Sequence, residues 1–221
     1  MSLRFTIIPQ RIVLWGAIGQ ARLIGEVVKR RGSEIAAVFE EREQFPTPYP
    51  DLPLFRTWDP FAEWLEDQDK SDLGFSLGLN MNGQGRLDLH EKLVQLGLQP
   101  ATLVHPSAEI ASDAEIGEGS QIMAGVIIGP NTTIGKQVII NARAGVDHDN
   151  VIEDGVEIAP GATLCGMIKV GKCAWIAAGA TVLPVVQIGA NATVGAGAVV
   201  NKNVDANATV VGIPAKPLKK D

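Results

Sequence analysis

The chain is poor in aromatic residues and in the residues that build disulfide or metal frameworks. Phe, Trp and Tyr make up only 5% of its 221 residues, and there are two cysteines and three histidines. The cysteines, Cys165 and Cys173, provide neither a disulfide framework nor a zinc-binding spacing, so we interpret both as small structural thiols. A low aromatic share beside many Val, Ile, Ala and Gly residues favours thin stacked layers over a thick globular core.

The sequence also lacks an excess of positive charge and any long apolar segment. Its formal net charge of −6 and pI of about 5.1 argue against general binding to nucleic acid or to anionic membranes. No apolar run approaches the ~18 residues of a membrane-spanning helix, and no signal peptide opens the chain. We therefore expect a cytoplasmic protein with no nucleic-acid partner and no membrane insertion.

Aliphatic residues recur at every sixth position through most of the second half. The series runs unbroken from Ile110 to Val200, and the residue two before each is usually small, as at Ala144 and Ala162. A period of six fits neither an α-helix nor a lone amphipathic strand, but it is typical of a hexapeptide β-helix. Three hexapeptides then form one triangular coil with a filled interior. Chemistry must therefore lie on the outer faces, in loops or between subunits.

The first hundred residues predict a different architecture, in which strands alternate with helices. The expected elements are strands over 11–16, 34–39 and 74–79, helices over 20–31, 61–67 and 86–96, and a Pro-rich loop over 44–60. This alternation indicates a small parallel α/β domain. We therefore expect two domains, an α/β domain over residues 1–100 and a β-helix over residues 101–221, with 100–107 as the link between them.

Ligands of parallel α/β domains bind beyond the carboxyl ends of the strands. Here that edge carries Gly16, Gly19 and Gln20 after the first strand and Glu40 and Glu41 after the second. A G-x-x-G turn before a helix can bring backbone N–H groups to a phosphate. The turn is neither a G-x-G-x-x-G fingerprint nor a P-loop, so NAD binding is not expected. A purely structural strand–helix turn remains the alternative.

The β-helix contains one histidine, His148, which is flanked by Asp147 and Asp149. A carboxylate that hydrogen-bonds an imidazole sets its tautomer and raises its basicity, as a general base requires. The alternative is a surface histidine in a polar corner. A catalytic zinc takes about three protein ligands, and His90 falls on a predicted helix of the other domain. We therefore expect no metal site.

Five segments spread along the chain match a known family. They are RIVLWGAIGQAR, SLGLN, LVHPSAEI, IINARAGVDHDNVIEDGVEIAPGATLCG and VVGIPAKPLKK. Through them the whole chain resembles the bacterial sugar O-acyltransferases of the sialic-acid O-acetyltransferase type, and most of all the UDP-4-amino-sugar N-acetyltransferases. The resemblance implies a Rossmann-like domain followed by a left-handed β-helix. The left hand rests on the resemblance, because parallel β crossovers are nearly always right-handed.

The resemblance further implies a homotrimer with active sites between subunits, acetyl-CoA as donor and a nucleotide-linked amino sugar as acceptor. In the catalytic site, His148 matches the general base, Asp149 the acid that polarises it and Asn141 an asparagine one rung earlier. The residues that match the acetyl-CoA site are Glu157, Ala178 and Ala196. The residues that match the nucleotide-sugar site are Ile18, Gly19, Gln20, Glu40 and Glu41.

The sequence departs from the family where Gln20 and Glu157 replace its usual histidines and Glu40 its usual aspartate, which leaves the acceptor sugar less determined than the chemistry. The expected reaction is direct acyl transfer, in which His148 deprotonates the sugar amine. A backbone N–H in the glycine-rich rung near Gly161–Gly166 would stabilise the oxyanion, and Gly166 is assigned to the acetyl-CoA site.

Lys216, Lys219 and Lys220 follow the last rung. They either meet the phosphates of CoA or form a solvated tail. Two alternative functions stay open. One is O-acetylation of a free sugar such as a sialic acid, and the other is a non-catalytic trimeric scaffold that binds nucleotide sugars.

Overall fold

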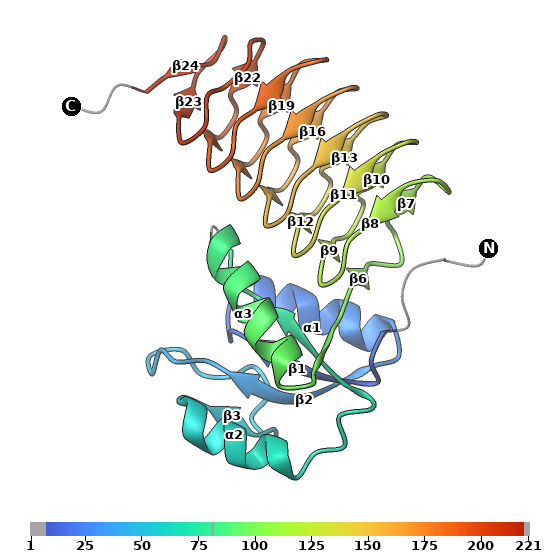
Figure 1. Cartoon of the computed structure of the whole chain (residues 1–221), viewed down its shortest axis with the longest axis vertical. Helices are drawn as coiled ribbons and strands as arrows, with labels where there is room; N and C mark the ends of the chain where they lie inside the picture. Colours follow the sequence, from blue (N-terminus) through green and yellow to red (C-terminus); the bar gives the residue numbers. More distant parts are fainter. Residues whose placement is uncertain (1–7, 81, 219–221) are drawn as a thin grey trace.

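A computed structural model describes residues 8–80 and 82–218, so Lys219 and Lys220 lie outside the described residues. Figure 1 shows two parts, an α/β unit formed by the first part of the chain and an elongated β-helix formed by the rest. The α/β unit lies beside the first coils of the β-helix. Within the described ranges, no helix is long and apolar enough to cross a membrane.

The α/β unit is built on a five-stranded parallel sheet with the order β3-β2-β1-β4-β5. Its elements are β1 (Arg11–Trp15), α1 (Gln20–Arg30), β2 (Glu34–Phe39), β3 (Leu54–Phe55), α2 (Trp58–Glu66), β4 (Leu73–Leu77), α3 (Gly83–Gln95) and β5 (Gln99–Pro100). Strand β4 is buried along its whole length, as expected for a central parallel strand covered on both faces. Helix α1 packs on one face, and α2 and α3 pack on the other.

Short strands appear where the sequence predicted none. The predicted loop 44–60 contains β3, and the predicted link 100–107 contains the end of β5 and the strand β6 (Leu103–Val104). Each of these strands has two residues, which is too short for a hydrophobic period to be visible in the sequence. They form because neighbouring strands offer partners for backbone pairing: β3 pairs with β2, β5 with β4 and β6 with β9 of the β-helix (Gln121–Ile122).

Two helices begin earlier than predicted. Helix α2 begins at Trp58 because Pro60 falls in its first turn, where backbone N–H groups have no partner within the helix. Helix α3 begins at Gly83 because Asn82 caps it, accepting a hydrogen bond from the Gly85 N–H at 3.0 Å.

From β6 onward the chain winds as a β-helix of short strands. In chain order these are β7 (Glu109–Ile110), β8 (Glu115–Ile116), β9 (Gln121–Ile122), β10 (Ile127–Ile128), β11 (Thr133–Ile134), β12 (Ile139–Ile140), β13 (Gly145–Val146), β14 (Val151–Ile152), β15 (Glu157–Ile158), β16 (Thr163–Leu164), β17 (Lys169–Val170), β18 (Trp175–Ile176), β19 (Thr181–Val182), β20 (Gln187–Ile188), β21 (Thr193–Val194), β22 (Val199–Val200), β23 (Thr209–Val211) and β24 (Lys216–Pro217). Residues eighteen apart pair in parallel through most of the coils, as Val146 does with Leu164.

The strands make three flat sheets that meet at corners. The first sheet holds β6, β9, β12, β15, β18, β21, β23 and β24, the second holds β7, β10, β13, β16, β19 and β22, and the third holds β8, β11, β14, β17 and β20. The corners require a left-handed backbone every six residues, as at Asn131, Gln137, Arg143 and Asp149. Asparagine and aspartate tolerate that conformation better than most residues.

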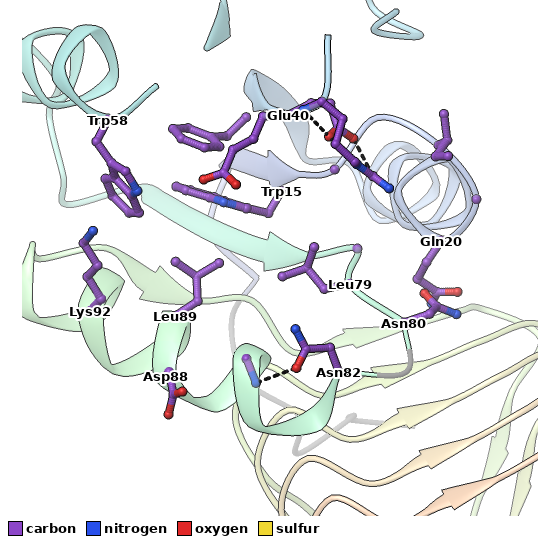
Figure 2. A pocket seen from close by; sticks show the side chains of 18 residues that line it. Trp15, Gln20, Glu40, Trp58, Leu79, Asn80, Asn82, Asp88, Leu89 and Lys92 are labelled. Carbon is purple, nitrogen blue, oxygen red and sulfur yellow. Dashed lines mark hydrogen bonds and ion pairs between the residues drawn. The ribbon is translucent and has the colours of Figure 1, made fainter. Parts of the chain in front are cut away.

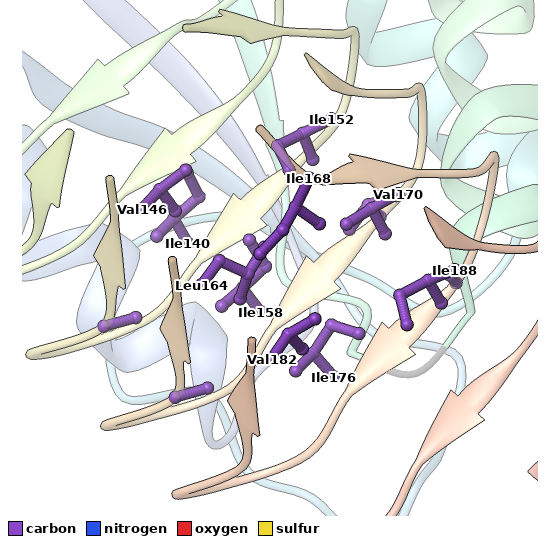
Figure 3. Close-up of a cluster of buried hydrophobic side chains, with 14 of the residues drawn as sticks. Ile140, Val146, Ile152, Ile158, Leu164, Ile168, Val170, Ile176, Val182 and Ile188 are labelled. Carbon is purple, nitrogen blue, oxygen red and sulfur yellow. The ribbon is translucent and has the colours of Figure 1, made fainter. Parts of the chain in front are cut away.

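The predicted aliphatic series forms the interior of the β-helix (Figure 3). Its members are buried from Ile122 to Val200, while Ile110 and Ile116 in the first coil are only partly buried. The hexapeptide prediction is therefore confirmed. Because the column is filled by side chains, substrates must bind outside it.

Ile134 and its neighbour Thr133 offer a matched test of this interior. Ile134 is 2% exposed in the column, whereas Thr133 points outward on the third sheet. We expect Ile134→Ala to lower the free energy of unfolding by about 2–5 kcal/mol, because it removes buried methyl groups and leaves a cavity. Thr133→Ala should change it by about 0.5 kcal/mol or less. Urea denaturation measures both, and equal effects would contradict the inward assignment.

Candidate active site

A cavity of about 730 Å³ opens at the carboxyl ends of the α/β strands (Figure 2). Its wall includes the turn between β1 and α1, the end of β2, the loop after β4 and one side of α3. The five residues predicted to hold a nucleotide sugar all line it: Ile18, Gly19, Gln20, Glu40 and Glu41. The structure therefore brings these predicted residues together around one space.

The turn after β1 has a backbone that only glycine adopts readily. Gly16 has φ 98°, and Gly19 has φ 54° with ψ −115°. The turn leads directly into the N-terminus of α1, where unpaired N–H groups and the helix dipole favour an anion. The cavity wall at this point suits a phosphate group.

Aromatic rings form another part of the wall. Trp15 stacks on Phe39 with ring centroids 4.5 Å apart, and Trp58 lies 5.3 Å from Phe39. The Lys92 ammonium nitrogen lies 3.1 Å from the Trp58 ring centroid. Flat rings offer a surface for a nucleobase, and the cation adds positive charge beside it. Trp58 and Lys92 could not be predicted from the sequence, because they lie on separate helices with no local motif.

Glu40 holds the turn rather than standing free in the cavity. Its carboxylate accepts hydrogen bonds from the Ala17 N–H at 3.1 Å and from the Arg42 guanidinium at 2.8 Å, and it is 4% exposed. Burial alone would raise the pKa of Glu40, but the hydrogen bonds from Arg42 and Ala17 outweigh it and lower the pKa. Glu40 is thus ionised at neutral pH. Its neighbour Glu41 is exposed at the wall.

A buried arginine joins the loop after β4 to the β-helix. Arg86 on α3 is 0% exposed and donates hydrogen bonds to the backbone carbonyls of Leu79, Gln137 and Gly155 at 2.8, 3.1 and 2.7 Å. It also lies 3.8 Å from the carboxylate of Glu157. Burial lowers the pKa of Arg86, and the charge of Glu157 opposes that shift. The sequence carried no signal for this contact.

Glu157 lies on β15, where the first sheet meets the α/β unit. It is 4% exposed, and its Oε1 accepts a hydrogen bond from the Asn80 side chain at 3.1 Å. Asn80 also lines the cavity. The position predicted to meet acetyl-CoA is therefore at the junction of the two parts of the chain.

His148 occupies the corner between the second and third sheets. Its Nδ1 lies 2.6 Å from Oδ2 of Asp149, and Oδ1 of Asp149 accepts a hydrogen bond from the Asn131 side chain at 2.6 Å. Because an ionised carboxylate only accepts, Nδ1 carries the proton and Nε2 keeps a lone pair. The ring points outward, with 46% of the side chain exposed. The alternation of inward and outward side chains along a strand could not predict the direction of the ring, because the chain turns a corner here.

The carboxylates around His148 perturb both partners. The hydrogen bond to Asp149 raises the pKa of His148, and the charges of Asp147 and Asp149 act in the same direction. The hydrogen bond from Asn131 holds the pKa of Asp149 below its ordinary value, helped by His148. The sequence analysis missed Asn131, although its distance of eighteen residues from Asp149 is one full coil.

Gly166 lies directly against the His148 ring. A Cβ at this position would overlap the imidazole, so only glycine leaves room for the ring. The N–H groups of Cys165 and Met167 are used in hydrogen bonds between coils, to Val182 and His148. Among the backbone hydrogen bonds of the described residues, none uses the Gly166 N–H. The Gly166 N–H is therefore the candidate hydrogen-bond donor to a ligand at the His148 corner.

The remaining predicted residues lie elsewhere on the β-helix. Asn141, Ala178 and Ala196 lie at the corner between the first and second sheets, and Lys216 lies on β24 at the far end. Within one chain, the cavity and the His148 corner are therefore separate. Residues 8–80 and 82–218 contain no cluster of three or more His, Cys, Asp or Glu side chains that could hold a metal ion.

Known proteins share this architecture. The repeats match a family model described as bacterial transferase hexapeptide (six repeats), over residues 113–148 and 167–202. The solved structure of PerB from Caulobacter crescentus, in complex with CoA and GDP-perosamine, is 30% identical with a TM-score of 0.84, and the match covers 94% of this chain and 97% of PerB. The chain belongs to the hexapeptide-repeat sugar acyltransferases. The predicted family and the predicted fold, a Rossmann-like α/β part followed by a left-handed β-helix, are confirmed.

Two further relatives of this hexapeptide-repeat acyltransferase are informative. GDP-perosamine N-acetyltransferase from Escherichia coli O157:H7 is 37% identical over 95 residues, which are 43% of this chain and 43% of that protein's length. The acetyltransferase domain of PglB from Neisseria gonorrhoeae, solved with acetyl coenzyme A, is 28% identical with a TM-score of 0.83 and matches over 95% of this chain and 99% of its own.

The electrostatics of the His148 corner can be measured directly. We expect NMR titration to give His148 a pKa above the ordinary histidine value of about 6.5. Asp149→Asn should lower that pKa, because the imidazolium loses its carboxylate partner. An Asp149→Asn variant with an unchanged His148 titration would contradict the pairing.

Proposed function

We propose that the chain acts as a cytoplasmic homotrimer that transfers the acetyl group of acetyl-CoA to the amine of a nucleotide-linked amino sugar. The observation that carries the proposal is the His148–Asp149–Asn131 arrangement, an oriented imidazole with a free Nε2 at the surface of the β-helix. The relatives support the donor and acceptor, because PerB was solved with CoA and GDP-perosamine and the PglB domain with acetyl coenzyme A.

The chemistry requires one base and no covalent intermediate on the protein. The sugar nitrogen attacks the thioester carbonyl carbon while His148 Nε2 takes its proton, and the C–S bond then breaks to release CoA, whose sulfur can take that proton. Asp149 stabilises the imidazolium that forms. The Gly166 N–H is the proposed donor to the oxyanion. A positioned base contributes about 10²–10⁴ in rate, and one oxyanion donor about 10²–10³.

The cavity suits the nucleotide part of the acceptor. We place the diphosphate at the Gly16–Gly19 turn, the base near Trp58 and the sugar toward Asn80, which borders the β-helix. The sequence resemblance favours uridine, whereas the Escherichia coli relative and PerB are described with GDP-perosamine. The proposal for this chain is therefore a nucleoside diphosphate sugar, and its base is to be measured.

The proposed trimer rests on the unequal faces of the β-helix. From β10 onward the second sheet presents only uncharged side chains, namely Ile127, Gly145, Thr163, Thr181 and Val199. The third sheet carries Glu115 and Lys169. Exposed apolar side chains continue from the second sheet onto the His148 corner: Met167, Leu183 and Val185.

Packing second sheets around a threefold axis would pair unlike corners of neighbouring chains. The His148 corner of one chain would then meet the neighbour's corner between its first and second sheets, which carries Asn141. That corner borders the cavity, because Asn141 donates a hydrogen bond to Gln20 at 3.2 Å. His148 and the cavity are separate within one chain, but in this trimer His148 of one subunit would lie beside the cavity of the next.

The proposed acetyl-CoA site runs along the same junction. Ala178 and Ala196 are exposed and stack in successive coils, where the Gly197 N–H donates to the Ala178 carbonyl at 2.9 Å. Their small side chains leave a smooth edge, along which the CoA arm would run between Glu157, the exposed Lys216 and, across the interface, Gly166 of the neighbouring chain. We keep O-acetylation of a free sugar and the scaffold role as outcomes of the tests below.

Removal of the base should stop catalysis without removing the substrates. We expect His148→Ala to lower kcat by about 10²–10⁴ while the dissociation constant of acetyl-CoA stays nearly unchanged. The matched control is His105→Ala, which should keep wild-type turnover. Steady-state kinetics with UDP- and GDP-linked amino sugars and with a free sialic acid identifies the acceptor. Wild-type turnover by His148→Ala would remove the histidine-base mechanism, whereas no turnover by the unaltered protein with any of these acceptors would support the scaffold role.

A mixing experiment tests whether the site is shared. His148→Ala and Gly19→Val each remove one half of the proposed site, and both trimers should be inactive alone. After co-expression, roughly a quarter of the sites should combine an intact His148 with an intact neighbouring Gly19 and regain activity. Sedimentation should show trimers for both variants. No recovery in mixed trimers, or a monomeric wild type, would exclude a site built from two chains.

A further inference from the structure

Gln20 lines the cavity, and the amide at the end of its side chain lies in the junction between the two parts of the chain. It is 4% exposed, and Figure 2 shows it extending from the start of α1 toward the coils of the β-helix. Its Nε2 donates to Oε1 of Gln121 on β9 at 2.9 Å. Its Oε1 accepts from Nδ2 of Asn141 at 3.2 Å.

Both ends of this chain of amides stop at backbone groups. Gln121 Nε2 donates to the Leu77 carbonyl at 2.8 Å, and Asn141 Oδ1 accepts from the Ala142 N–H at 2.9 Å. A carbonyl can only accept and an N–H can only donate. The orientation of all three side-chain amides between them is therefore fixed. We call this series from the Leu77 carbonyl to the Ala142 N–H the amide relay.

The amide relay connects two elements beside the cavity, β4 and α1, to the β-helix. Leu77 ends β4, and Gln20 begins α1 directly after Gly19. Gln121 lies on β9 and Asn141 directly follows β12, in successive coils of the β-helix. No amide can turn around without placing oxygen against oxygen or nitrogen against nitrogen. Such mismatches are costly in a buried place. The relay thus holds the start of α1 at one distance from the β-helix.

We propose that Gln20 is a positioning residue, which acts through the amide relay and keeps the Gly16–Gly19 turn in the geometry that binds the nucleoside diphosphate. The proposal rests on the proposed function and deepens it. Asn141 belongs to the same device, because its side-chain amide holds Gln20.

Gln20→Glu tests the fixed direction of the relay. One carboxylate oxygen can accept from Asn141, but the other faces Oε1 of Gln121, whose nitrogen is required at Leu77. We expect the dissociation constants of UDP and GDP, measured by calorimetry, to rise about tenfold for whichever the wild type binds. The acetyl-CoA constant should stay within about twofold. The matched control is Gln95→Glu, on the exposed end of α3, which should change neither.

Gln20→His adds a readout that a purely structural role would not move. A neutral imidazole can donate to Gln121 and accept from Asn141, so nucleotide binding should match the wild type near pH 8. An imidazolium has two donors, so one of them faces the Asn141 amide hydrogens. Nucleotide binding by this variant should therefore weaken as the pH falls toward about 6, while the wild type should not show this loss.

The outcomes separate this inference from the proposed function. A wild type that binds neither UDP nor GDP removes the proposed function. A wild type that binds one of them, with Gln20→Glu binding equally well, removes the positioning role. Equal weakening of nucleotide and acetyl-CoA binding would also overturn it, because that result indicates general loosening. If Gln20→Glu does not fold, a pH-independent Gln20→His variant overturns the proposal by itself.

Discussion

Backbone pairing between residues eighteen apart is the constraint on which the His148 corner depends. It stacks Asn131 under Asp149 in successive coils, which is why an asparagine far away in sequence donates to the carboxylate beside His148. It also sets Gly166 against the imidazole. The left-handed backbone of Asp149, with φ 57°, turns the chain at this point. The corner is therefore oriented by the fold itself and needs no flexible loop.

Buried polar contacts define how the α/β unit sits on the β-helix. Arg86 donates to carbonyls on both parts, and the amide relay runs through Gln20 into two coils. An apolar junction tolerates sliding, but buried polar groups are costly unless each finds its partner. These contacts therefore favour one relative placement of cavity and β-helix. The cavity in which the nucleotide is proposed to bind is thereby fixed relative to the surface on which acyl transfer is proposed.

Sequence reasoning succeeded where the signal was periodic or local. The period of six from Ile110 to Val200 predicted the coils, because every inward position requires an aliphatic side chain. The pairing of His148 with Asp149 was visible because the residues are adjacent. Two-residue strands such as β3 carry no period, so they were missed. The direction of the His148 ring could not be predicted, because His148 lies at a corner, where side chains do not alternate between inward and outward as they do along a strand.

The junction was the part least readable from the sequence. Arg86 and Trp58 stand in ordinary amphipathic helices, and nothing local distinguishes them from solvated or core residues. Gln20 was predicted to face the ligand because it follows the glycine turn, yet its side chain is taken up by Gln121 and Asn141. A residue at the start of a helix can contact a ligand through its backbone while its side chain holds another element. Only the packing of the two parts separates these roles.

Assembly would also change the base itself. In the isolated chain the His148 ring is half exposed, and its pKa is raised by the hydrogen bond to Asp149. A raised pKa keeps more of the ring protonated at neutral pH, and a protonated ring cannot accept a proton from the substrate. In the proposed trimer a neighbouring chain covers this corner, and loss of water disfavours the charged imidazolium and lowers its pKa. The contact that brings His148 to the neighbour's cavity would thus also offset part of that rise in pKa, so that more of the ring is neutral when it meets the substrate amine.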